Sequence, residues 1–224
     1  MGHEILDEPG VADALVARSH GDIARANALF GGTRAVVARV RALAPCLPES
    51  PLVVDVGAGT GDILDAVCEV LRATGRRPRP VAIDTALSLA PAVRLRGSHF
   101  ICGSIFALPL PTASADLVIA AQVVHHFPPE ALPAVFAELN RVARQAVLVS
   151  DLQRSWLAAA GLWLTSFPLG FHPVSRHDGV VSVLRGFAPD ELRHAVRTAT
   201  GVTAEVRTHL GWRVTADWHP GHAA

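Results

Sequence analysis

The chain has 224 residues, half of them apolar, and its 20 basic and 20 acidic residues leave no net charge. This length supports one sizeable hydrophobic core, so one globular domain is expected. The balanced charge favours a small-molecule partner and predicts neither a nucleic-acid partner nor a membrane partner. The sequence contains no lysine and no tyrosine, which excludes a Schiff-base lysine and a tyrosine general base.

Cysteine usage and the N-terminus give expectations about location. Cys46, Cys68 and Cys102 are odd in number and form no C-x-x-C pair, which argues against a disulfide framework and against a zinc site. A reducing cytoplasm suits them. No stretch reaches about 18 uninterrupted apolar residues, and the acidic N-terminus has no apolar core, so we expect neither a membrane span nor an export signal.

The first part of the chain is predicted to be helical. Apolar residues recur at helical spacing over residues 11–44 and are interrupted at Gly31-Gly32, which predicts two or three helices. From Pro51 onward, short apolar runs alternate with helical segments, the pattern of βαβ units and a mostly parallel sheet. The predicted strands cover residues 52–56, 80–85, 99–103, 115–122 and 145–151.

The regular alternation stops between residues 152 and 186. We expect a helix to about residue 165, followed by a loop in which His177-Asp178-Gly179 has the composition of a turn. A helix then begins near Pro189, because proline suits the first helical turn and acidic residues follow it. Alternating residues on both sides of Leu210-Gly211 predict a terminal hairpin.

The stretch "VVDVGAGTGD", residues 53–62, places three glycines at every second position after a buried strand. The dinucleotide fingerprint G-x-G-x-x-G would need a glycine where Asp62 stands. Asp55 and Asp62 are also unfavourable for an anionic pyrophosphate. A ligand with a cationic end fits these residues better.

These residues resemble the first motif of the class I S-adenosylmethionine-dependent methyltransferases, an acidic residue followed by G-x-G-x-G. In that family a carboxylate after the second strand bonds both ribose hydroxyls, and Asp84 occupies this place. Ser104 stands where the family usually has an aspartate near the adenine amino group. The resemblance implies cofactor contacts from Asp55, Gly57, Ala58, Gly59, Gly61, Asp84, Thr85, Ser104, Ile105 and Gln122.

The resemblance covers roughly residues 52–217 and implies a doubly wound, Rossmann-like α/β fold. Its seven-stranded, mostly parallel sheet would have the order 3-2-1-4-5-7-6, with strand 7 antiparallel. We expect an N-terminal helical cap over residues 1–48. The methyltransferase domain would cover residues 49–224, with a helical lid at about 152–186 between strands 5 and 6.

The loop after the fourth strand supplies the candidate catalytic residues. A hydroxyl acceptor must lose its proton, and histidine titrates in the useful range, so His125 or His126 is a candidate base. Alternatively, the pair caps the loop by bonding to the backbone. Two histidines without a third ligand make a poor zinc site, so no metal is expected.

Candidate acceptor contacts come mainly from the segment between the fifth and sixth strands. Aromatic residues there either line an acceptor pocket or form ordinary core. Asp151 either binds the acceptor or caps the helix that follows it. The candidate substrate residues are His126, Asp151, Trp156, Trp163, Phe171 and Arg185.

The sequence thus predicts a cytoplasmic methyltransferase, monomeric or homodimeric, that uses S-adenosylmethionine. The expected acceptor is small and apolar or aromatic, with a phenolic or enolic oxygen. Two segments, "SDLQRSW" and "HDGVVSVLRGFAPDEL", resemble bacterial methyltransferases of polyketide or quinone-like pathways. The alternatives are carbon methylation of a quinone-like ring, a non-catalytic module that binds the cofactor, and an NAD-dependent oxidoreductase.

Overall fold

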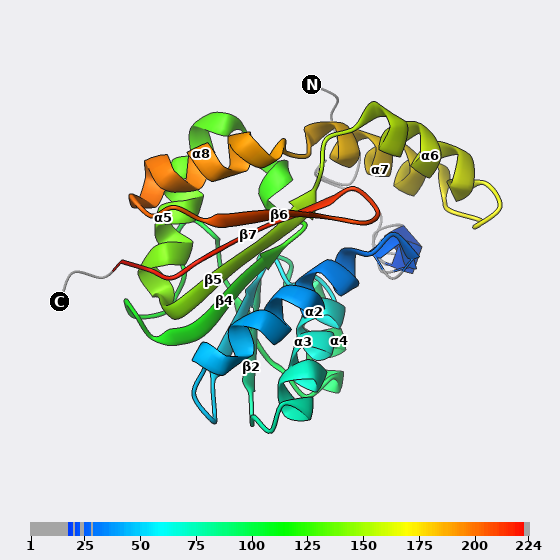
Figure 1. Cartoon of the computed structure of the whole chain (residues 1–224). Coiled ribbons are helices and arrows are strands. Elements are labelled where there is room, and N and C mark those ends of the chain that lie inside the picture. Colours follow the sequence, from blue (N-terminus) through cyan, green and yellow to red (C-terminus); the bar gives the residue numbers. More distant parts are fainter. Residues whose placement is uncertain (1–17, 20, 23–24, 28, 222–224) are drawn as a thin grey trace.

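The computed structural model of the chain describes residues 18–19, 21–22, 25–27 and 29–221. Its centre is a seven-stranded sheet with the order β3-β2-β1-β4-β5-β7-β6 (Figure 1). Strands β1 to β5 pair in parallel, whereas β7 runs antiparallel to β5 and β6. The expected sheet order and the antiparallel seventh strand are therefore confirmed. The strands are β1 (Leu52–Val56), β2 (Arg79–Asp84), β3 (His99–Cys102), β4 (Ala115–Ala121), β5 (Ala143–Leu152), β6 (Glu205–His209) and β7 (Arg213–Trp218).

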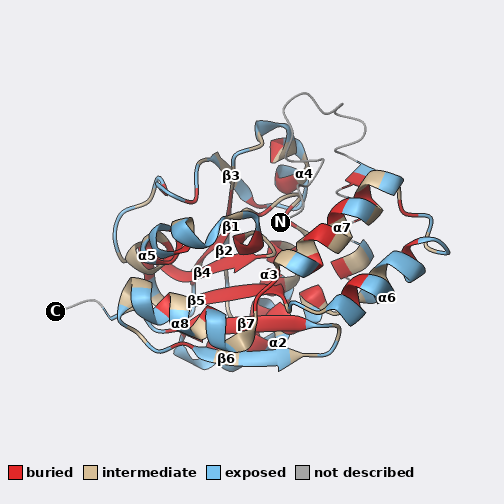
Figure 2. Ribbon diagram, turned by 90° about the horizontal axis from the view of Figure 1, so that it is seen from above, coloured by how far each residue is buried: buried red, intermediate tan, exposed pale blue. Residues whose placement is uncertain are grey.

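Helices cover both faces of this sheet (Figures 1 and 2). One face packs against α2 (Gly32–Leu43), α3 (Asp62–Ala73) and α4 (Ala90–Leu95). The other face packs against α5 (Leu132–Val142) and α8 (Pro189–Thr200). Two hydrophobic cores result, one on each side of the sheet. Within the described ranges, no helix is both long and apolar enough to cross a lipid bilayer.

Strand β4 shows why the central strands have continuous apolar sequences. Val118 and Ala120 belong to the core beneath α5 and α8, whereas Leu117 and Ile119 belong to the opposite core. Successive side chains of a strand point to opposite faces, so a strand covered on both faces needs apolar residues at every position. The uninterrupted run at 115–121 follows from this arrangement.

The expected N-terminal helices are present in part. Helix α2 begins directly after Gly31, whose φ of 79° matches the interruption expected at Gly31-Gly32. Residues 11–17 of the predicted helical stretch lie outside the described residues.

The segment between β5 and α8 differs from the prediction. Helix α6 (Trp156–Ser166) is present as expected, but α7 (Pro173–Arg185) occupies the place of the predicted loop. Its first turn suits Pro173, and the ring of His172 accepts a hydrogen bond from the Val174 N–H. The His177-Asp178-Gly179 stretch lies inside this helix, so its prediction as a turn is wrong. We call α6, α7 and their connection, residues 156–185, the α6–α7 hairpin.

A buried ion pair joins α2 to the sheet. The guanidinium of Arg39 donates to both carboxylate oxygens of Asp217 on β7, at 2.8 and 2.9 Å, and also to Glu205 on β6, at 2.8 Å. The hydrogen bond and the charge of Asp217 raise the pKa of Arg39 despite its burial.

Replacing Arg39 with alanine is expected to lower the free energy of unfolding by about 3 kcal/mol, because the carboxylate of Asp217 would stay buried without a partner. Arg193→Ala is the matched control: Arg193 pairs with Asp190 on the surface within one helix, and such pairs contribute less than about 1 kcal/mol. Chemical denaturation measures both. Equal losses of unfolding free energy in the two variants would contradict the larger contribution assigned to the buried Arg39–Asp217 pair.

Candidate active site

A cavity of about 780 Å³ opens at the carboxyl ends of β1, β2 and β4. The sheet order reverses between β1 and β4, and ligands of open α/β sheets bind at such a reversal. Residues of α6 and α7 close the cavity from the opposite side. Both candidate histidines and eight of the ten predicted cofactor residues line it. These eight are Gly57, Ala58, Gly59, Asp84, Thr85, Ser104, Ile105 and Gln122.

The glycine loop between β1 and α3 is shaped by its neighbours. Gly57 has a φ of 71°, and a Cβ atom at this position would lie 2.5 Å from a methyl group of Val123. Gly61, with a φ of 78°, directly precedes the first residue of α3. Other side chains are excluded at Gly57 both by its backbone conformation and by the close approach of the loop after β4.

Asp84 connects the glycine loop to the end of β2. One carboxylate oxygen accepts the N–H of Gly59 at 2.9 Å, and the other accepts the N–H of Ala86 at 2.9 Å. A carboxylate oxygen has two acceptor sites, so each retains capacity for a hydroxyl. The side chain therefore lies on the cavity wall with both oxygens oriented by the backbone.

Asp55 lies on β1 and is almost completely buried. Its Oδ1 atom has no hydrogen-bond partner. Burial raises the pKa of this carboxyl well above its ordinary value, and the charges of Asp62 and Asp84 add to the effect. Asp62 and Asp84 line the cavity, and two acids there suit a ligand with positive charge. The sulfonium and ammonium groups of S-adenosylmethionine fit this requirement, whereas a pyrophosphate does not.

Replacing Asp55 with asparagine is expected to stabilise the ligand-free protein at pH 7. Because the folded-state pKa is raised above the unfolded value near 3.9, the folded protein binds this proton more tightly than the unfolded chain. The free energy of unfolding therefore falls as the pH rises from about 4 towards the raised pKa. The variant lacks this decrease, which denaturation at several pH values would reveal. An unchanged pH dependence would contradict the buried, unpaired state of Asp55.

The loop after β3 forms the side of the cavity where the adenine contact was predicted. Ser104 and Ile105 both line the cavity, and Ile105 is buried. Helix α5 braces this loop: the carboxylate of Glu138 accepts the Leu108 N–H at 2.7 Å, and Arg141 donates to the Leu108 carbonyl at 3.2 Å. The hydrogen bond from Arg141 lowers the pKa of Glu138. The loop is thus fixed by charged groups outside the cavity.

His125 is paired with Asp151. Its Nδ1 lies 2.6 Å from one carboxylate oxygen, and its backbone N–H donates to the other at 3.1 Å. Burial opposes ionisation of Asp151, but the charge and hydrogen bonds of His125 and the N–H of Leu152 together lower its pKa. The ionised carboxylate of Asp151 accepts a hydrogen bond from the Nδ1–H group of His125. Nε2 is therefore the ring nitrogen that Asp151 does not contact.

His126 also lines the cavity, with its ring centroid 4.3 Å from that of His125. The two histidines belong to a short helical turn, η4 (Val124–His126), which begins three residues after the last residue of β4. Among the described residues, no group of three or more potential ligands could hold a metal ion.

Arg213, at the start of β7, is a cavity residue that the sequence analysis missed. It is buried, donates to the side chain of Gln122 at 3.0 Å, and reaches the Phe30 carbonyl at 3.3 Å. Burial lowers its pKa to about 10, although the charge of Asp151 opposes this shift. Nothing in the sequence of β7, which also contains Thr215 and Asp217, distinguished Arg213 as a cavity residue.

Five of the six predicted substrate residues do not line the cavity. Asp151 is buried behind His125, and the ring of Phe171 lies under the guanidinium of Arg25. The side chain of Trp156 is exposed. The residues outside the cavity are Asp151, Trp156, Trp163, Phe171 and Arg185. Of the cofactor set, Asp55 and Gly61 also do not line it.

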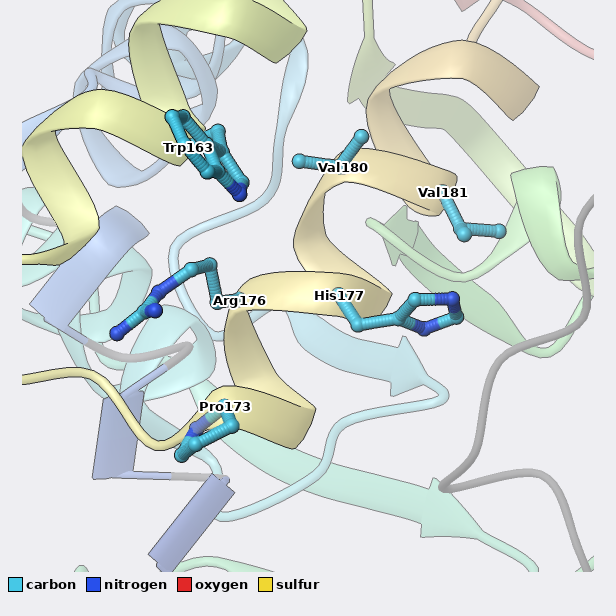
Figure 3. Close-up of a pocket in the computed structure, with 6 residues that line it drawn as sticks. All are labelled: Trp163, Pro173, Arg176, His177, Val180 and Val181. Atoms are coloured by element: carbon cyan, nitrogen blue, oxygen red, sulfur yellow. The ribbon is translucent and has the colours of Figure 1, made fainter.

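Trp163 lines a smaller cavity of about 450 Å³ in the α6–α7 hairpin (Figure 3). Arg176 and His177 extend to different sides of α7 there. The Arg176 guanidinium lies 3.7 Å from the centroid of the Phe167 ring, and this ring contacts Trp163 edge to face. We expect these aromatic residues to hold the hairpin together.

Comparisons with known proteins agree with this geometry. Residues 54–149 match the family model described as a methyltransferase domain. No curated protein matches the chain in sequence.

Solved structures share the fold. A putative methyltransferase from an antibiotic biosynthesis pathway of Anabaena variabilis is 22% identical, with a TM-score of 0.52 over 79% of this chain and 68% of that chain. Magnesium protoporphyrin IX methyltransferase from Synechocystis with bound S-adenosylmethionine is 14% identical, with a TM-score of 0.57 over 96% and 87%. A Haloferax volcanii complex of a putative methyltransferase and its Trm112 activator gives 13% identity and a TM-score of 0.63 over 95% and 100%.

Residues 54–149 match a methyltransferase domain, and the sheet order of the chain is that of the fold shared with these solved structures. The matched segment contains the glycine loop, Asp84 and both histidines of the cavity. A methyltransferase domain over residues 54–149 argues against the NAD-dependent oxidoreductase.

Proposed function

We propose that the protein transfers the methyl group of S-adenosylmethionine to the oxygen of a small apolar or aromatic acceptor with a phenolic or enolic hydroxyl. One observation carries this proposal: a histidine held by a buried aspartate lines the cavity beside the glycine loop. A hydroxyl acceptor has a proton to lose, and His125 is placed to accept it.

The bound cofactor supplies an electrophilic methyl group on a sulfonium. The acceptor oxygen forms a bond to this methyl carbon while the carbon–sulfur bond breaks, and the sulfur keeps the bonding electrons. The acceptor proton goes to Nε2 of His125, because Nδ1 already carries a proton, which it donates in a hydrogen bond to Asp151. The resulting imidazolium is stabilised by the ionised Asp151.

The size and lining of the cavity support an apolar acceptor. Its volume of about 780 Å³ lies within the usual range for small-molecule sites. Aromatic and aliphatic side chains contribute to the lining. They include Phe30, Phe127, Leu162, Val183 and Trp212. Alignment of acceptor and methyl group in this enclosed space accounts for much of the expected acceleration.

The division of the chain follows the sequence prediction. We propose that residues 1–48 form a cap and that residues 49–224 form the methyltransferase domain. The α6–α7 hairpin acts as its lid, which the cavity-lining residues Leu162 and Val183 support. The described cysteines are free, and a reducing cytoplasm suits them.

Incubation with methyl-labelled S-adenosylmethionine and a panel of phenols, pyrones and quinols tests the proposal. We expect label on the oxygen of at least one acceptor, and none on the corresponding methyl ethers. Label on a ring carbon would show carbon methylation instead. Calorimetric binding of S-adenosylhomocysteine without turnover of any acceptor would favour the non-catalytic module.

A further inference from the structure

Arg213 places a positive charge on the β7 side of the main cavity. It is the first residue of β7, pairs with Leu152 of β5, and has an exposed fraction of 4%. In the sheet order β7 is the third strand from β1, and neighbouring strands lie about 4.8 Å apart. Because Arg213 lines the cavity, its charge faces a bound molecule and not bulk water.

The guanidinium of Arg213 is hydrogen-bonded to neutral oxygens. Nη1 donates to the side-chain oxygen of Gln122 at 3.0 Å, and Nε donates to the backbone carbonyl of Phe30 at 3.3 Å. A guanidinium has five N–H groups, so three remain for another partner. Among the residues that the structure describes, no carboxylate forms an ion pair with Arg213.

Asp151 is the carboxylate whose charge acts on Arg213, but its oxygens are engaged elsewhere. They accept hydrogen bonds from the backbone N–H and the ring of His125, and from the backbone N–H of Leu152. Burial lowers the pKa of Arg213 to about 10, although the charge of Asp151 raises it. Arg213 is therefore charged at neutral pH, and the protein itself compensates this buried charge only in part.

The backbone around Arg213 holds the guanidinium in place. Gln122 and Trp212 both line the cavity and have φ angles of 56° and 52°, in the left-handed region that side chains other than glycine seldom adopt. A Cβ atom at Gly211 would lie 2.1 Å from the carbonyl oxygen of Phe30. The turn between β6 and β7 thus packs against the residues that lead into α2 (Figure 1). Such constrained backbone is frequent where a protein holds a ligand.

The cofactor brings no net negative charge to balance Arg213. Its amino-acid end has an ammonium group beside the carboxylate, and its sulfonium adds a further positive charge. Asp62 and Asp84 line the cavity and offset positive charge near the glycine loop. Buried charges in proteins are normally paired. The other molecule that enters the cavity, the acceptor, is therefore the source of an anion for Arg213.

We propose that Arg213 binds a carboxylate group of the acceptor, which makes the acceptor a hydroxylated carboxylic acid and not a neutral phenol. The planar guanidinium matches the two oxygens of a carboxylate. A carboxylate is ionised at neutral pH before it binds, whereas a phenol loses its proton only during transfer. This inference rests on the proposed methyl transfer to a hydroxyl oxygen and narrows the class of acceptor.

Calorimetry on the full chain saturated with S-adenosylhomocysteine tests the inference. The probes are the three isomers of hydroxybenzoate and the corresponding neutral hydroxybenzamides. We expect the wild type to bind at least one acid about tenfold or more tightly than its amide, because hydrogen bonds to a charged group are lost in the amide. In Arg213→Met this preference should disappear, and Arg213→Lys should retain part of it.

The matched control is Arg193→Met, which removes an arginine that pairs with Asp190 on the surface. It should keep the preference of the wild type. The affinity of each variant for S-adenosylhomocysteine verifies its folding and should change little.

Equal affinities of the wild type for every acid and its amide would overturn the inference, as would a preference that persists in Arg213→Met. A loss of affinity for S-adenosylhomocysteine in this variant, without a loss for 5′-methylthioadenosine, would assign Arg213 to the carboxylate of the cofactor and also overturn it. Methyl transfer to neutral phenols with no preference for acids would overturn this inference but leave the proposed function intact.

Discussion

Replacing His125 with glutamine is expected to lower kcat for a hydroxyl acceptor by about 100-fold or more, because the acceptor proton loses its base. Affinity for S-adenosylhomocysteine should change little. His126→Gln is the matched control, since His126 lines the same cavity and lies next in sequence. We expect a much smaller loss for this variant. Steady-state kinetics with saturating cofactor measures both.

Asp151→Asn extends this prediction to the partner of the histidine. An amide cannot hold the Nδ1 proton of His125 as a carboxylate does, so Nε2 would no longer be a free base in most molecules. We expect kcat to fall and the pH dependence of kcat to change, whereas a purely structural role would lower stability alone. Equal, small losses of kcat in His125→Gln and His126→Gln would contradict the role of His125 as a base. Catalysis would then depend only on positioning of the acceptor.

Replacing Asp84 with alanine is expected to weaken cofactor binding by about 1.5–3 kcal/mol. The ribose hydroxyls would lose the hydrogen bonds that they donate to the charged carboxylate of Asp84. Asp84→Asn should have a smaller effect, since it keeps one acceptor oxygen. Calorimetry with S-adenosylhomocysteine gives the dissociation constants.

A ligand-side control separates the ribose contact from an effect on the glycine loop, which Asp84 also holds through Gly59. The wild type should bind the 2′-deoxy analogue of S-adenosylhomocysteine more weakly than the parent compound. In Asp84→Ala this difference should disappear. A difference that persists would assign Asp84 to the loop and not to the ribose.

Local sequence patterns were sufficient for most of the fold. The runs at 52–56 and 115–121 are strands because they are buried on both faces. Helix α7 was missed because a proline and a His-Asp-Gly stretch usually interrupt helices. A Cβ at Gly179 would lie 3.0 Å from Leu162, so close packing of α7 on α6 accounts for a glycine there. Such contacts between segments outweigh local preference and are not visible in the sequence.

The residues of the site that directly follow strands could be predicted from the sequence. Parallel strands bring their carboxyl ends to one edge, so the glycine loop, Asp84 and the histidines were expected together. The pairing of His125 with Asp151 was not foreseen, because it depends on register. Ala121 of β4 pairs with Ser150 of β5, which places Asp151 beside the loop that follows β4. Both residues were candidates from the sequence, but Asp151 was expected to bind the acceptor or to cap the following helix.

A crystal structure with bound S-adenosylhomocysteine tests the central claim most directly. We expect the ribose hydroxyls at Asp84, the homocysteine end beside the glycine loop, and the sulfur facing His125. A nucleoside bound away from the glycine loop, or a sulfur directed away from His125, would contradict the proposed transfer to an oxygen activated by this histidine.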